Sequence, residues 1–206
     1  MVENRQLHPG AESLFAAVLH QAATKFRIVD KENELGIRLL SMFSGLDHYK
    51  RLYVHQVTEF TGAGAPFIIL LLEKHQMIAK NLSSGMRYPV EIEEVEPVLI
   101  FSLPQDIGHV FIKEETLGDK VTDLLTKQDI DFEAYPQFSS NYYVTGDNPD
   151  MVKLHLPASL MKLLGKLKGL QIEINRKVGI VRTEKNLSED VLLQLITIGH
   201  QVSAEV

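Results

Sequence analysis

Hydrophobic and polar positions follow their clearest periodicity in the last third of the chain. Along Leu170–Arg176, isoleucines alternate with polar residues, which is the period-two pattern of a half-buried strand. Asp147 or Asn148 can cap one helix and Ser188 another, and Leu156–Pro157 predicts a helix break. These signals predict, in chain order, a strand over 141–145, a helix to about 155, a helix over 158–167, strands over 170–176 and 178–182, and a helix after 188.

The first two thirds of the chain contain further periodic segments. Ser13 is a candidate helix cap after a loose lead-in, and the glycine-containing segment 61–65 is typical of a hairpin turn. Pro97 is expected at a strand end. The pattern predicts helices over 14–26 and 35–43, hairpin strands over 52–60 and 66–76, strands over 97–103 and 109–113, and a helix over 117–128.

This order of elements predicts an α+β fold with a mainly antiparallel sheet and helices packed on one face. Its last third contributes strand–helix–strand–strand–helix. With 206 residues, of which 45% are hydrophobic, we expect a single compact domain over 1–206. The alternative is two packed halves, 11–128 and 129–206, with a seam at 129–140.

Composition excludes several classes of protein. The absence of Cys excludes disulfide scaffolds, thiolate metal sites and cysteine nucleophiles. The longest apolar run, Ala65–Leu72, has eight residues, whereas a spanning helix needs about 20. The first ten residues lack the basic and apolar regions of a signal peptide. We therefore expect a soluble cytoplasmic protein with no transmembrane segment.

Charge is distributed unevenly around the net value of −6. Residues 87–134 contain twelve acidic and four basic residues, whereas 151–186 contain eight basic and two acidic ones. One interpretation is two solvated faces that attract each other. The other is a basic docking surface for an anionic partner, formed by Lys162, Lys166, Lys168, Arg176, Lys177, Arg182 and Lys185. Aromatic residues are not interleaved with these cations, which disfavours nucleic acid as the partner.

Motifs for catalysis, cofactors and metals are not found in the sequence. Gly62-Ala-Gly64 reads as a hairpin turn because a strand, not a helix, follows it. The eight histidines show no paired metal-ligand spacing, so we expect no metal and no cofactor. The adjacent glutamates Glu93-Glu94 and Glu114-Glu115 read as solvent-facing, and no assembled reaction centre is expected.

Two histidines are the catalytic candidates. If the residue numbers of paired hairpin positions sum to 128, His55 lies opposite Glu73. Such a pair could transfer a proton or bind a metal, but a satisfied, half-buried histidine is the commoner outcome. His109, near Asp106 in the preceding turn, is a similar case.

The chain also resembles a known family. The segments that carry the resemblance are Lys25-Phe-Arg27, Asp129-Ile-Asp-Phe132, Phe138-x-x-x-Tyr142-Tyr-Val-x-Gly-Asp147 and Leu156-Pro-Ala-Ser-Leu160. They are similar to the soluble part of an uncharacterised bacterial family, whose α+β region often follows one or two N-terminal transmembrane helices. This chain departs from that pattern in having no membrane segment. The resemblance implies the fold and carries no catalytic residues over.

The leading functional hypothesis is a non-catalytic binding or interaction module for an anionic ligand or a protein partner. A second is a small-molecule or lipid pocket lined by the strand Phe67–Leu72. A third is a hydrolase or transferase that uses His55 or His109. Whether the protein is an enzyme, and its oligomeric state, stay open at the level of sequence.

Overall fold

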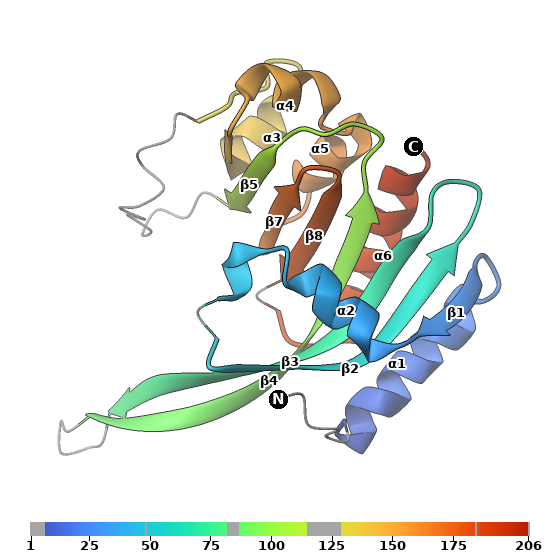
Figure 1. Cartoon of the computed structure of the whole chain (residues 1–206), viewed down its shortest axis with the longest axis vertical. Helices are drawn as coiled ribbons and strands as arrows, with labels where there is room; N and C mark the ends of the chain where they lie inside the picture. Colours follow the sequence, from blue (N-terminus) through green and yellow to red (C-terminus); the bar gives the residue numbers. More distant parts are fainter. Residues whose placement is uncertain (1–6, 48, 82–86, 115–128, 184, 206) are drawn as a thin grey trace.

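An antiparallel sheet is the centre of the computed structural model (Figure 1). The structure describes residues 7–47, 49–81, 87–114, 129–183 and 185–205, and eight strands lie within them. The strands are β1 (Arg27–Lys31), β2 (Arg51–Thr61), β3 (Phe67–Asn81), β4 (Arg87–Ser102), β5 (His109–Glu114), β6 (Tyr142–Gly146), β7 (Leu170–Asn175) and β8 (Val178–Thr183). Their order is β1-β2-β3-β4-β8-β7-β5-β6, and every neighbouring pair is antiparallel. The predicted α+β class is confirmed.

Helices flank this sheet. They are α1 (Pro9–Ala22), α2 (Asn33–Leu40), α3 (Pro136–Asn141), α4 (Pro149–His155), α5 (Ala158–Leu164) and α6 (Glu189–Ser203), with a short turn of 3₁₀ helix, η1 (Ser44–Leu46). No helix in the described part of the chain is both long and apolar enough to span a membrane.

The two halves of the sequence share the sheet. β5, from the first half, lies between β7 and β6 of the second half. β8, also from the second half, pairs with β4 through Leu99–Ser102. The strands of the two halves are therefore interleaved.

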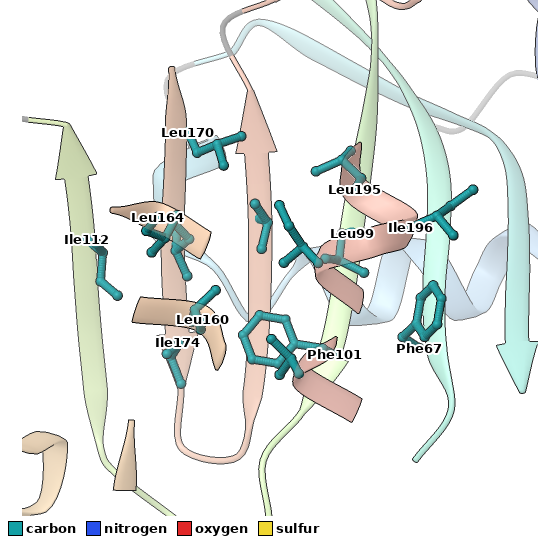
Figure 2. Packing of buried hydrophobic residues seen from close by; sticks show 14 of the residues in the cluster. Phe67, Leu99, Phe101, Ile112, Leu160, Leu164, Leu170, Ile174, Leu195 and Ile196 are labelled. Atoms are coloured by element: carbon teal, nitrogen blue, oxygen red, sulfur yellow. The ribbon is translucent and has the colours of Figure 1, made fainter. Parts of the chain in front are cut away.

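Each face of the sheet buries its own hydrophobic cluster. On β3, Ile69 and Leu71 belong to the larger cluster, whereas Leu70 and Leu72 belong to the smaller one, because successive side chains point to opposite faces. The larger cluster packs against α1 and the α3–α6 helices. It includes the residues labelled in Figure 2: Phe67, Leu99, Phe101, Ile112, Leu160, Leu164, Leu170, Ile174, Leu195 and Ile196.

The smaller cluster shows that helical cover is not restricted to one face. It combines Leu40 of α2 and Leu46 of η1 with the alternate residues of β2–β4. Figure 1 shows α2 on the near side of the sheet and α6 on the far side. The expectation of helices on one face is therefore incomplete, because the fully apolar run of β3 needs cover on both.

Local signals in the last third predict the observed helix boundaries. The Ser188 side chain accepts a hydrogen bond from the Val191 N–H at the start of α6, and Asn148 caps α4 in the same way. The break between α4 and α5 falls at Leu156–Pro157. α5 ends at Leu164, three residues earlier than predicted.

The N-terminal helix begins earlier than expected. α1 starts at Pro9, and the His8 Nδ1 atom, rather than Ser13, caps it by accepting from the Gly10 N–H. Proline suits the first helical position, because the N–H it lacks would have no partner there. The supposed loose lead-in is therefore helical. β1 is absent from the predicted elements, since its five residues are mostly polar and too short to show a clear alternation.

Two further predictions need correction or cannot be tested. β4 begins at Arg87 and continues through Pro97, so this proline does not mark a strand end. Pro97 lies beyond the Leu99–Ser102 ladder with β8, where a missing N–H costs no bond to that strand. The helix predicted over 117–128 lies outside the described residues.

Candidate functional site

The seven cations predicted to form one docking surface lie in different places. Lys168 and Lys185 are at one end of the β7–β8 hairpin, whereas Arg176 and Lys177 are at its turn. Six strand residues separate these ends by about 20 Å. Lys162 lies on the exposed side of α5, and Lys166 lies in the turn that follows this helix. The six exposed cations therefore do not make a single continuous patch.

Arg182 is not on the surface, which corrects its assignment to that docking surface. Its side chain is buried, with Nε donating to Glu96 Oε1 at 2.8 Å. Glu96 also accepts from Lys74 Nζ at 2.8 Å. The ring of Tyr49 lies 5.4 Å from Lys74 Nζ and 5.3 Å from the Arg182 guanidinium carbon. We call Lys74, Glu94, Glu96 and Arg182 the cation–carboxylate cluster. Its central Glu96 is 2% exposed, so the closely spaced glutamates Glu91, Glu93, Glu94 and Glu96 do not all face solvent.

Strong pairing keeps the cations of this cluster charged. Burial alone would lower the pKa of Lys74, but the hydrogen bond and charge of Glu96, with smaller contributions from Tyr49 and Glu94, raise it above its ordinary value. Burial opposes the charge of Arg182 in the same way, and Glu96 and Tyr49 raise its pKa. The cluster joins β3, β4 and β8 on the face that α2 covers.

His109 pairs with Glu173 rather than Asp106. His109 Nε2 lies 2.8 Å from Glu173 Oε1, whereas Asp106 accepts from the Gly108 N–H. The Glu173 carboxylate also accepts from the backbone N–H groups of Ser44 and Gly45, both at 2.9 Å. Burial would raise the pKa of Glu173, but the bonds from His109, Gly45 and Ser44 lower it overall. The adjoining hollow has a volume of about 10 Å³, room for at most one water.

His55 contacts Glu73, although not through the predicted register. The paired positions Tyr53–Glu73 and Val54–Leu72 sum to 126, not 128, and the register shifts between Val54 and Gln56. His55 is the extra residue at this bulge. A bulge redirects a side chain, and His55 Nε2 lies 2.8 Å from Glu73 Oε2.

A second histidine, which the sequence analysis did not select, completes the cluster. His75 Nε2 lies 2.6 Å from Glu73 Oε1, and its ring packs edge-on against Tyr53, with centroids 5.2 Å apart. On the other side of the ring, His75 Nδ1 lies 3.4 Å from Glu91 Oε1 and 3.8 Å from Glu93 Oε1. We call His55, Glu73, His75, Glu91 and Glu93 the histidine–carboxylate cluster.

Strand geometry assembles these side chains on one face. β3 and β4 pair His75 with Glu93 directly, and Glu73 and Glu91 are each two residues along their own strand. Side chains two apart on a strand share a face. Glu73 and His75 are 6% and 2% exposed, whereas the Glu93 side chain is 50% exposed. The cluster therefore reaches from the interior to the surface.

The expectation of no assembled reaction centre did not anticipate this grouping of two histidines and three carboxylates. One ligand atom each from Glu73, His75 and Glu93 can be chosen so that all lie within 4.8 Å of one another. Imidazole nitrogen and carboxylate oxygen are both ligands of transition metals. The structure therefore groups candidate metal ligands that the spacing of the histidines in the sequence does not indicate.

A sequence signal for this cluster existed but was subtle. Glu73-x-His75 and Glu91-x-Glu93 each place two ligand-type side chains on one face of a strand. The predicted strand over 66–76 already contains Glu73 and His75. Glu91 and Glu93 precede the strand predicted from 97, so their shared face could be recognised only if that strand began near Arg87.

Searches of protein-family models, curated proteins and solved structures found no match to this chain. The resemblance to an uncharacterised bacterial family stays a prediction.

Proposed function

We propose that the protein is a non-catalytic binding module that holds a divalent transition-metal ion at the histidine–carboxylate cluster. His75 Nδ1 and the carboxylates of Glu93 and Glu91 are the proposed ligands. The supporting observation is the position of this nitrogen, which lies 3.4 Å from Glu91 Oε1 and 3.8 Å from Glu93 Oε1.

The hydrogen-bonding state of His75 favours a cation beside Nδ1. An ionised Glu73 only accepts hydrogen bonds, so a neutral His75 ring donates from Nε2 and carries its lone pair on Nδ1. A lone pair facing two carboxylate oxygens is repulsive; Lys50 Nζ, 3.8 Å from Glu91 Oε1, offsets part of that repulsion, and a proton or a metal ion beside Nδ1 would remove it. The metal proposal and a doubly protonated ring are therefore the two states to distinguish.

The separations fit metal ligands better than hydrogen-bond partners. Hydrogen bonds from nitrogen to oxygen span about 2.7–3.2 Å. Two ligands of a tetrahedral zinc ion, each about 2.0–2.2 Å from the metal, are roughly 3.3–3.5 Å apart. The distance from His75 Nδ1 to Glu91 matches that spacing, and the distance to Glu93 exceeds it by a few tenths of an ångström.

Glu73 and His55 support the proposed ligand from behind. Metal-binding histidines usually donate their second ring N–H to a carboxylate, which orients the ring and raises its basicity. Glu73 holds that position on His75, and His55 contacts the other oxygen of Glu73. An imidazole ligand favours zinc or a neighbouring transition metal over the hard ions Mg²⁺ and Ca²⁺.

Calorimetric titration with zinc tests the proposal. The full-length chain is treated with EDTA, dialysed and titrated with ZnCl₂ at pH 7, with MgCl₂ as the hard-ion comparison. We expect one saturable zinc site per chain. Glu93→Gln should weaken it at least about tenfold. Glu94→Gln is the matched control, because Glu94 is adjacent in sequence but pairs with Lys74 on the other face.

The outcomes separate the two states of His75. Absence of saturable zinc binding, or equal loss in Glu93→Gln and Glu94→Gln, contradicts the metal site and leaves the protonated ring. Because Glu93 is half exposed, its substitution should leave the fold intact, which circular dichroism checks.

A catalytic role finds less support. Both carboxylate oxygens of Glu73 contact imidazole nitrogens. Glu173 accepts hydrogen bonds from two backbone amides beside a hollow of about 10 Å³. The hollow beside Glu173 is too small for a substrate. We therefore propose no reaction at His55 or His109. Cytoplasmic location is part of the proposal, supported by a chain without cysteine, and subcellular fractionation tests it.

A further inference from the structure

We propose that the groove between α3 and α5 is a binding site for a small amphipathic anion, independent of the proposed metal site. The groove has a volume of about 290 Å³, near the lower end for small-molecule pockets. It is lined on one side by residues 134–138 and on the other by Met161, Lys162, Gly165 and Lys166.

An apolar floor lies between these two walls. Phe138 and Met161 underlie the groove and are 1% and 4% exposed, so most of its accessible apolar surface comes from the exposed Ala134 and Pro136. The half-buried ring of Tyr135 adds an aromatic wall. The walls approach closely at Gly165, where an added Cβ would lie 3.2 Å from Gln137 Cβ. This narrow apolar trough suits a hydrocarbon or aryl group.

Two cations line the same groove. Lys162 and Lys166 are both exposed, and neither forms an ion pair with any residue in the described part of the chain. Like charges four residues apart on a helical turn repel each other. A bound anion would relieve that repulsion, and an ammonium beside low-dielectric side chains attracts an anion more strongly than one in open solvent.

Shape and charge together select the ligand class. The apolar floor favours a ligand with a hydrophobic body, and the two ammonium groups favour a carboxylate, sulfonate or phosphate head. The concave trough fits a small molecule better than a flat protein surface. The small-molecule hypothesis therefore moves away from the strand Phe67–Leu72, whose residues other than the partly buried Ile68 are buried in the two cores.

Three probes separate the contributions of charge and apolar surface. The full-length chain is titrated by calorimetry with decanoate, with decanol, which lacks the charge, and with acetate, which lacks the apolar body. We expect saturable binding of decanoate alone, weakening as salt rises. A short single-stranded DNA serves as a fourth probe for a polyanion partner.

Variants locate the site. Lys162→Gln with Lys166→Gln should weaken decanoate binding at least tenfold. The control, Lys153→Gln with Lys177→Gln, removes two exposed lysines elsewhere and should leave binding unchanged. Ala134→Trp places a bulky ring in the groove from an exposed position and should also abolish binding without changing charge.

The inference would be overturned if decanoate did not bind, if decanol bound equally well, or if the control pair lost binding to the same extent. It would also be overturned if DNA bound instead of decanoate and Lys162→Gln with Lys166→Gln abolished that DNA binding. Zinc titration of the same variants keeps the two proposals separate, since we expect their zinc affinity to equal that of the unmodified chain.

Discussion

The two polar clusters on β3 and β4 are assembled from neighbouring residues yet differ in chemistry. Lys74 and His75 are adjacent in sequence, and so are Glu93 and Glu94. Strand alternation sends Lys74 and Glu94 to the face that α2 covers and His75 and Glu93 to the other. One β-ladder thus carries the cation–carboxylate cluster on one face and the histidine–carboxylate cluster on the other.

The partners of the carboxylates explain the difference. Glu96 is bonded to an ammonium and a guanidinium, which are permanently charged at neutral pH and cannot bind a metal. Glu73 is bonded to two imidazoles, and a neutral imidazole can bind a metal ion. The first cluster is therefore suited to holding strands together, and the second has the side-chain types that our metal-binding proposal requires.

Loss of the Glu96 carboxylate should cause the largest decrease in the free energy of unfolding. Glu96→Ala leaves the buried Lys74 and Arg182 without their shared carboxylate, and breaking a buried pair from one side costs about 3–5 kcal/mol. Urea denaturation measures the loss, and zinc affinity of the folded variant should not change. Glu94→Ala removes a half-exposed partner and should cost no more than about 1 kcal/mol. A loss below that value in Glu96→Ala would contradict a structural role.

Glu73→Gln should affect zinc binding next most strongly. Removing the carboxylate that orients a ligating histidine lowers metal affinity about 10–100-fold. Calorimetry with ZnCl₂ measures the change, and thermal unfolding checks that the variant folds. Glu59→Gln is the control, because Glu59 pairs with Lys31 at the sheet surface. Unchanged zinc affinity in Glu73→Gln would show that Glu73 does not position His75.

The Glu173 carboxylate is bonded to an imidazole and to two backbone amides. We expect Glu173→Gln to lower the free energy of unfolding by about 1–3 kcal/mol at neutral pH, and by less in acid. The folded pKa of Glu173 is lowered from the ordinary value of 4.5, so its contribution is present above pH 4.5 and lost as pH falls through the lowered value. The stability difference between the unmodified chain and Glu173→Gln, measured in urea from pH 7 to pH 3, should shrink over that range. A difference that grows toward acid would contradict this assignment.

Lys74→Met should show the smallest pH dependence of its effect on stability. The folded pKa of Lys74 is raised above 10.5, so its contribution is complete below pH 10.5 and lost only as pH rises through the raised value. The stability difference between the unmodified chain and Lys74→Met should therefore stay constant from pH 6 to pH 9. A slope in the Lys74→Met difference would remove the distinction between the clusters.

Zinc affinity should fall on acidification from pH 7 to pH 5, because metal ligands must be deprotonated. The same calorimetric titration measures this fall.

Sequence predicted best what local chemistry determines. Ser188, Asn148 and Pro157 act on backbone groups within a few residues, so the last third could be predicted closely. α1 shows the limit, since a histidine cap at His8 is not among the usual capping residues.

Long-range pairing could not be predicted in the same way. Arg182 is buried only because β8 pairs with β4 and brings Glu96 within reach, and the two residues are 86 apart in sequence. The histidine–carboxylate cluster depends on a one-residue bulge at His55 and on the register of β3 with β4. A single-residue slip in either would send the side chains to the opposite face.

The place of β8 between β4 and β7 has a consequence for biosynthesis. Most of the sheet emerges from the ribosome first, yet its two portions cannot join until Val178–Thr183 has been made. Until then, β4 and β7 each present an open edge, the kind of surface through which nascent chains associate wrongly. A premature stop codon just ahead of Val178 should therefore yield an aggregating product rather than a shorter soluble one.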